Sequence, residues 1–160
     1  MDESGFQNLV AQFGVLTGTV VVCFISGFVP VVNAELYLLV VAAMIPKTMF
    51  LPVLLLATFG QMSAKSLIYL TGKGVIRLPV KKLEQGIARM EERMERWESG
   101  IGTFMFVSAF SGFPPFYLST FAAGAMRLRF NYFLLTGFSG RLLRFGAVMF
   151  FPQLFKELFL

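Results

Sequence analysis

Residues 20–46 read VVVCFISGFVPVVNAELYLLVVAAMIP, an apolar stretch with a break at its centre. The run from Ser4 to Ala34, which includes this break, has no charged residue and exceeds the roughly 20 residues that cross a bilayer. Beyond the break, the apolar residues from Leu36 to Ile45 are too few to cross again. We therefore expect the chain to return to the side of the membrane from which it entered.

The residues of the break support this interpretation. Gly27, Pro30 and Asn33 interrupt the apolar pattern, and irregular backbone inside a membrane is tolerated where protein or water satisfies its polar groups. We predict a re-entrant helical hairpin that turns at these three residues. The alternative is a spanning helix followed by a short helix on the membrane surface.

The composition of the whole chain fits lipid better than water. Of the 160 residues, 56% are hydrophobic and 14% are charged, and the mean hydropathy is +0.72. Soluble domains have about 45–50% apolar residues. The N-terminus carries Asp2 and Glu3 in place of a basic region, so we expect no removable signal peptide. The sequence predicts an all-α integral membrane protein with several crossings.

The composition also argues against several classes of function. The net charge is +5, yet the basic residues are interleaved with glutamates such as Glu91 and Glu95, so we expect no nucleic-acid binding. Histidine is absent and Cys23 is the single cysteine, which removes the commonest general base and any thiolate metal site. We expect neither a metal nor a cofactor, and we predict that the chain is not an enzyme.

The second half of the chain repeats the order of features found in the first. The apolar run from Ile101 to Met126 is broken by Gly112, Pro114 and Pro115, and SGFPP at 111–115 matches SGFVP at 26–30. Each break is followed by a short apolar limb, a basic turn and a spanning segment with small residues and an internal cation. The spanning segments are predicted at Met49–Leu70 and Phe130–Phe151.

These features predict one membrane domain, residues 1–160, made of two repeats at about 6–72 and 101–151. Residues 73–100 between the repeats are polar, and their apolar residues recur at steps of four and three, as in an amphipathic helix. Those residues are Leu83, Ile87, Met90, Met94 and Trp97. A stripe of this kind is more often a packing or membrane-surface face than a specific site.

The distribution of basic residues predicts the orientation of the repeats. Most lysines and arginines lie in residues 73–100 and in the turn at Arg127 and Arg129, and the positive-inside rule places these segments in the cytoplasm. The two re-entrant hairpins then enter from opposite faces, as in an inverted repeat. Paired apolar segments broken by glycine and proline in two such halves indicate a transport site near the bilayer midplane.

Four ionisable residues lie within apolar sequence: Glu35, Lys65, Arg141 and Arg144. Each costs about 2.5–3.5 kcal/mol at bilayer depth on insertion scales, so we expect them to pair around a wet cavity. Arg141 and Arg144, three residues apart, share a helix face and are predicted to hold a phosphate by forked hydrogen bonds. Glu35 is predicted to carry a proton. The alternative is that these charges join helices, or that Lys65 and Arg144 extend to the membrane interface.

Together these residues resemble the DedA family, also called the SNARE-associated or VTT domain family, over roughly residues 16–150. The stretch PVVNAE at Pro30–Glu35 is similar to the proline-then-glutamate hairpin of the family, and the most specific match is FPPFYLSTFAAGAMRLRFNYF at Phe113–Phe133. Where many members have an acidic residue or asparagine, this chain has Lys65. The remaining matches are Gly60, Tyr69, Gly72, Lys73, Gly140, Arg141, Arg144 and Phe145.

The resemblance implies two opposed re-entrant hairpins, a location in the inner (plasma) membrane, and the movement of lipids or polyprenyl-phosphate carriers between leaflets, coupled in some members to protons. The expected partners are therefore membrane lipids or lipid phosphates and protons, and the small number of hydrophobic segments leaves a homodimer open. The alternatives are an ion or small-solute transporter that uses the same cavity and a membrane scaffold that transports nothing.

Overall fold

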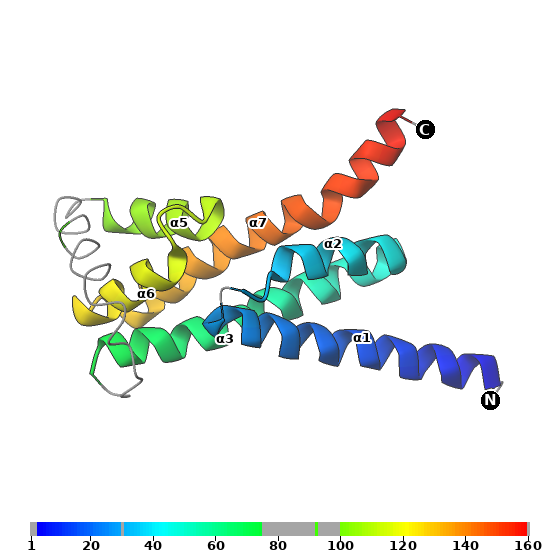
Figure 1. The fold of residues 1–160 in the computed structure, drawn as a ribbon, viewed down its shortest axis with the longest axis horizontal. Helices are drawn as coiled ribbons and strands as arrows, with labels where there is room; N and C mark the ends of the chain where they lie inside the picture. Colours follow the sequence, from blue (N-terminus) through cyan, green and yellow to red (C-terminus); the bar gives the residue numbers. More distant parts are fainter. Residues whose placement is uncertain (1–2, 30, 75–91, 93–99, 160) are drawn as a thin grey trace. The chain divides into compact units, whose positions relative to one another are not determined.

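The computed structural model describes residues 3–29, 31–74, 92 and 100–159. All regular structure within these residues is helical (Figure 1). Pro30 of the first break and the five apolar positions of the predicted amphipathic helix lie outside them. The helices are α1 (Glu3–Phe28), α2 (Ala34–Met44), the short 3-10 helix η1 (Lys47–Met49), α3 (Phe50–Gly72), α5 (Ile101–Ser111), α6 (Phe116–Ala125) and α7 (Phe130–Phe159).

Three helical segments are long and apolar enough to cross a membrane. They are Ala11–Phe28, Lys47–Gly72 and Phe130–Phe151. The second and third confirm the predicted positions of the spanning segments, and together the three indicate a membrane protein. Two further apolar helices, α2 and α5, have 11 residues each and are too short to span.

The first break separates α1 from α2 at residues 29–33. Gly27, predicted to be part of the break, lies instead in the last turn of α1, so the break begins two residues later. Asn33 has the predicted place and a specific role there. Its side chain accepts hydrogen bonds from the backbone N–H groups of Glu35 (2.9 Å) and Leu36 (3.3 Å), which satisfies two donors at the start of α2.

The second break separates α5 from α6 at residues 112–115. Gly112 ends α5 with a φ of 78°, in the left-handed region that glycine adopts without a Cβ penalty, and its N–H donates to the carbonyl of Ser108. The Phe113–Pro114 peptide bond is cis, and α6 begins directly after Pro115. All three predicted break residues thus lie in the turn between the two helices.

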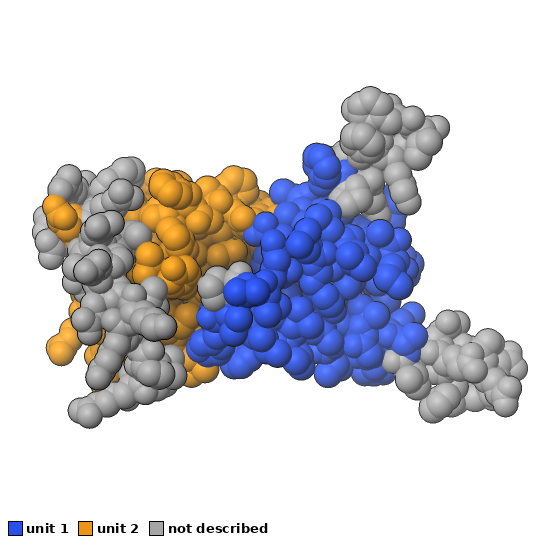
Figure 2. Space-filling model, in the orientation of Figure 1, with its two compact units in different colours: residues 1–61, 145–160 blue, residues 62–144 orange. Residues whose placement is uncertain are grey.

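The chain divides into two compact units, residues 1–61 with 145–160 (unit 1) and residues 62–144 (unit 2), coloured separately in Figure 2. Unit 1 contains α1, α2, the first part of α3 and the last part of α7. Unit 2 contains α5, α6, the first part of α7 and the last part of α3. The units therefore differ from the predicted repeats, because both α3 and α7 contribute to both units.

Unit 1 is built on the packing of α2 against α1 (Figure 1). The hydroxyl groups of Thr19 and Tyr37 lie 3.1 Å apart and join the two helices. Gly60 of α3 lies so close to α1 that a Cβ there would come within 2.6 Å of the Val20 carbonyl oxygen. The buried apolar core of this unit comprises Cys23, Ala34, Leu38, Val41, Ala42, Phe50, Val53, Ala57, Phe145 and Met149.

Unit 2 is built in a similar way on the packing of α6 against α5. Gly140 of α7 approaches α5 so closely that a Cβ there would lie 2.9 Å from the Phe106 carbonyl oxygen. The side chain of Tyr69 is fully buried, stacks on Phe133 with ring centroids 4.9 Å apart, and donates a hydrogen bond to the Leu128 carbonyl. The buried core comprises Met62, Tyr69, Phe104, Met105, Ala109, Phe116, Ala122, Ala123 and Phe133.

Candidate functional site

The break between α5 and α6 is held by buried hydroxyl groups. The Ser108 hydroxyl donates to the carbonyl of Pro114 at 2.7 Å and lies 2.9 Å from the hydroxyl of Ser119. Both serines are fully buried. Because a buried carbonyl without a hydrogen bond is costly, Ser108 stabilises the irregular backbone of the turn and fixes its position against both helices.

Arg144 of α7 reaches the end of α5. Its Nη1 donates a hydrogen bond of 2.7 Å to the carbonyl of Phe110, one of the last four carbonyls of α5, which have no partner within the helix. The guanidinium charge also interacts favourably with the negative end of the α5 dipole. Gly112 makes room for it, since a Cβ there would lie 2.9 Å from Nη1.

Arg141 lies one turn earlier on α7 and reaches the start of α6. Its side chain is only 8% exposed, and the guanidinium carbon is 4.9 Å from the ring centroid of Phe116, the first residue of α6. A cation over an aromatic face at this distance is attracted by the quadrupole of the ring. The two arginines therefore contact the two sides of the same break.

Lys65 of α3 is the third cation of unit 2 in this region. It is 4% exposed, and its Nζ is 5.9 Å from the ring centroid of Tyr117, which follows Phe116 on α6. The Lys65 and Arg141 charges are close enough to repel each other electrostatically. The burial of Lys65 against α6 favours a place inside the protein over extension to the membrane interface.

We call Lys65, Arg141 and Arg144 the cationic cluster. Its members come from α3 and α7 and contact either the end of α5 or the first turn of α6, so three of the four predicted site residues lie in unit 2. Glu35, the fourth, belongs to unit 1, where it is half-buried in the first turn of α2. Its pairing with the cations stays a prediction.

Several residues around the cationic cluster were not predicted as site residues. They are Phe110, Phe116, Tyr117 and, through the turn, Ser108 and Ser119. The aromatic pair directly after two prolines was the available signal, since the first turn of the returning helix must face whatever surrounds the break. Among the residues that the structure describes, His, Cys, Asp and Glu side chains form no group of three that would hold a metal ion.

Near the first break, unit 1 has a smaller group of buried polar side chains. The amide nitrogen of Gln61 donates to the hydroxyl of Ser26 at 3.2 Å, and that hydroxyl donates to the carbonyl of Cys23. The Gln61 Oε1 atom is buried without a hydrogen-bond partner among the described residues. This group lies where α1 approaches the first break, and it contains no charge.

Comparisons of the chain with protein-family models, with curated proteins and with solved structures find no match. The resemblance to the DedA family therefore rests on the residues quoted for it from the sequence.

Proposed function

We propose that the chain is a membrane transporter of the DedA or VTT type, which moves lipids or polyprenyl-phosphate carriers between the leaflets of the inner membrane. The observation that supports this function is the cationic cluster, in which three cations from two long helices lie at the turn of a broken helix pair. In this proposal the cluster binds the phosphate of the lipid head group.

The energetics of the cluster support an anionic substrate. Each cation at bilayer depth costs about 2.5–3.5 kcal/mol on insertion scales, and the mutual repulsion of Lys65 and Arg141 adds to that cost. A phosphate between them would reverse the sign of this interaction and accept charge-assisted hydrogen bonds from the guanidinium groups. A function in anion binding accounts for keeping such a combination inside the membrane.

The start of α6 adds to the positive character of this place. The helix begins at Phe116 without a side-chain cap, so its first N–H groups and the positive end of its dipole point toward the turn. Helix starts of this kind bind anionic groups of substrates in transporters with broken helices.

The two helix pairs support the inverted-repeat part of the proposal. In each unit a glycine of the long helix that follows the pair meets the backbone of the first helix of that pair, Gly60 at Val20 and Gly140 at Phe106. In this proposal the two hairpins are re-entrant and opposed, and Glu35 carries the proton. Proton coupling, the homodimer and the opposed insertion are parts of this proposal.

The test is the inter-leaflet movement of a fluorescent phospholipid in proteoliposomes. We expect movement with the native chain that is lost in Glu35→Gln and in the Arg141→Ala, Arg144→Ala double variant. Lys73→Gln is the matched control, because this exposed lysine at the end of α3 lies outside the cluster. If vesicles with the native protein show no faster inter-leaflet movement than vesicles without protein, this result would contradict lipid transport and favour an ion or small-solute substrate.

A membrane scaffold is the second candidate, and one observation favours it. Arg144 already donates to the end of α5 and Arg141 already lies over Phe116, so both arginines stabilise the helix packing. For a scaffold, Arg144→Ala would lower the stability of the protein, and no lipid, ion or solute movement would follow addition of the native chain to vesicles.

A further inference from the structure

Unit 1 contains a cavity of about 190 Å³ between the start of α3 and α7. It is lined by Lys47, Phe50, Leu51, Leu54, Met149 and Phe150. Its floor is formed by Phe50 and Met149, which are 4% and 1% exposed, whereas the side chains at its rim are open to the surroundings of the protein. The rings of Phe50 and Phe150 meet at a centroid distance of 5.7 Å and close one side.

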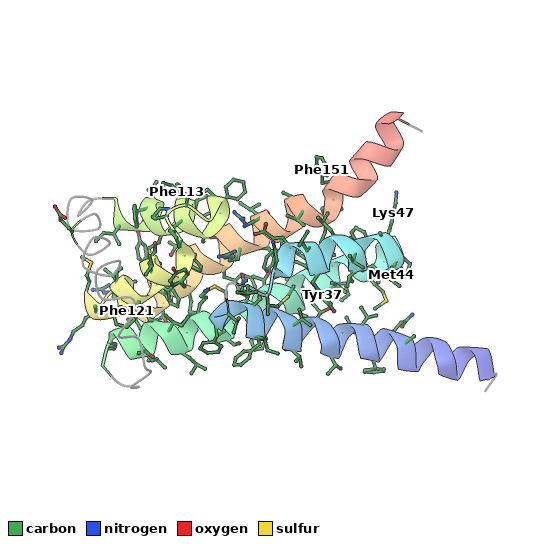
Figure 3. The ribbon with its side chains drawn as sticks, in the orientation of Figure 1. Tyr37, Met44, Lys47, Phe113, Phe121 and Phe151 are labelled. Carbon is green, nitrogen blue, oxygen red and sulfur yellow. The ribbon has the colours of Figure 1, made fainter. Side chains whose placement is uncertain are left out.

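The cavity lies at one end of a membrane span. Lys47 is the first residue of the apolar segment Lys47–Gly72, and Leu51 and Leu54 follow it along the same side of the chain into that segment. Figure 3 shows the Lys47 side chain at the turn between α2 and α3, extended away from the helices. The charge is therefore at the depth of the lipid head groups, and the apolar lining continues from it toward the hydrocarbon.

A charged group at the head-group depth, followed by apolar side chains toward the hydrocarbon, matches the polar head and apolar chain of an amphiphile. We propose that the cavity is a binding site for an anionic phospholipid, with its phosphate at the Lys47 ammonium and part of one acyl chain between Leu54 and Phe150. The volume supports a partial occupant, because cavities that enclose a whole small ligand measure about 300–1,000 Å³. The remaining lipid would lie in the bilayer against Leu51, whose side chain is 64% exposed.

Charge complementarity selects the lipid class. Among the described residues that line the cavity, Lys47 alone is charged, so a zwitterionic head group gains less there than an anionic one. This site is in unit 1, and it shares no residue with the cationic cluster of unit 2. Its occupancy does not depend on transport, so the two proposals can fail separately.

The test measures contact between lipid and a tryptophan placed at the cavity rim. The full chain with Trp97→Phe, which removes the single native tryptophan, and Leu51→Trp is reconstituted in phosphatidylcholine vesicles. One set of vesicles contains brominated phosphatidylglycerol, and a second set contains the same fraction of brominated phosphatidylcholine. Bromine quenches tryptophan fluorescence on contact. We expect an apparent affinity about fivefold higher for the anionic lipid, the effect of one lysine at a membrane surface.

Matched variants identify the group responsible. Lys47→Gln should abolish the preference and Lys47→Arg should keep it, while Lys73→Gln at the other end of α3 should leave it unchanged. A reporter at Leu135 of unit 2, which is 71% exposed, should show no preference. Equal quenching by both lipids at residue 51 would overturn the proposal. So would a preference that survives Lys47→Gln, disappears in Lys73→Gln or is equally strong at residue 135.

Discussion

The two helix breaks begin with nearly the same sequence, SGFVP and SGFPP, but the backbone polar groups at the two breaks are hydrogen-bonded in different ways. At the first break a neutral side chain, Asn33, accepts hydrogen bonds from the start of α2. At the second, Gly112 adopts a left-handed conformation, and a cation, Arg144, donates a hydrogen bond to a carbonyl at the end of α5. The second break thus has a cation bound at its first side, and this is why we propose an anion site there.

Gly112→Ala should have the largest effect on stability of the variants that compare the two breaks. A Cβ in the left-handed region costs about 1–2 kcal/mol, and here it also lies 2.9 Å from Arg144 Nη1. The measurement is unfolding by sodium dodecyl sulfate in mixed micelles. Gly27→Ala, at the matching place of the first break but within helix α1, should cost less. Equal losses in the two variants would remove the distinction between the breaks.

Arg144→Ala should destabilise the protein by about 1–2 kcal/mol in the same unfolding measurement, because the carbonyl of Phe110 loses its donor. Arg144→Lys keeps the charge and one donor and should recover part of this loss. If neither variant changes the unfolding midpoint, the bond to Phe110 does not hold the second break, and the arginine is available entirely for a substrate.

Asn33→Ala should cost about 1 kcal/mol, the usual loss when a helix start loses its side-chain cap. Asn33→Asp and Asn33→Ser retain an acceptor at this position and should stay close to the native stability. An alanine variant as stable as the native protein would show that the first break is satisfied by something other than Asn33.

Tyr37→Phe should have the smallest effect, about 0.6 kcal/mol, the average for a hydrogen bond between helices in a membrane protein. The loss stays small because Thr19 still donates to the carbonyl of Val15. A loss above about 2 kcal/mol would mean that this contact is central to the packing of α2 on α1.

For the part of the chain that the structure describes, the positions of the helices and of both breaks could be predicted from the sequence, because hydropathy, glycine and proline act locally. Gly27 lies within α1, which continues to Phe28, so the glycine alone did not mark where the break begins. The rings of Phe116 and Tyr117 over which Arg141 and Lys65 lie could not be predicted. They depend on how α3 and α7 pack on α6, and nothing in the local sequence fixes that packing.

Which helix segments belong to each compact unit could not be predicted from the sequence either. Repeats are visible as an order of motifs along the chain, whereas compact units depend on which helix halves pack together. Both α3 and α7 begin in one unit and end in the other, so a division by motif at residues 72 and 101 misses the change at Gln61 and at Arg144.

Recognition of phosphate by the cationic cluster can be tested by comparing two fluorescent lipids in the same proteoliposomes. One carries a phosphate, as phosphatidylglycerol, and the other is a neutral glycolipid, as glucosylceramide. The variants are Lys65→Met and Arg141→Gln, each checked for native unfolding behaviour, with Lys73→Gln as the control.

We expect both cluster variants to slow the inter-leaflet movement of the phosphate lipid about tenfold or more, the effect of losing a charge-assisted hydrogen bond, and to leave the glycolipid rate unchanged. Equal slowing of both lipids, or unchanged movement of the phosphate lipid in well-folded variants, would contradict this expectation.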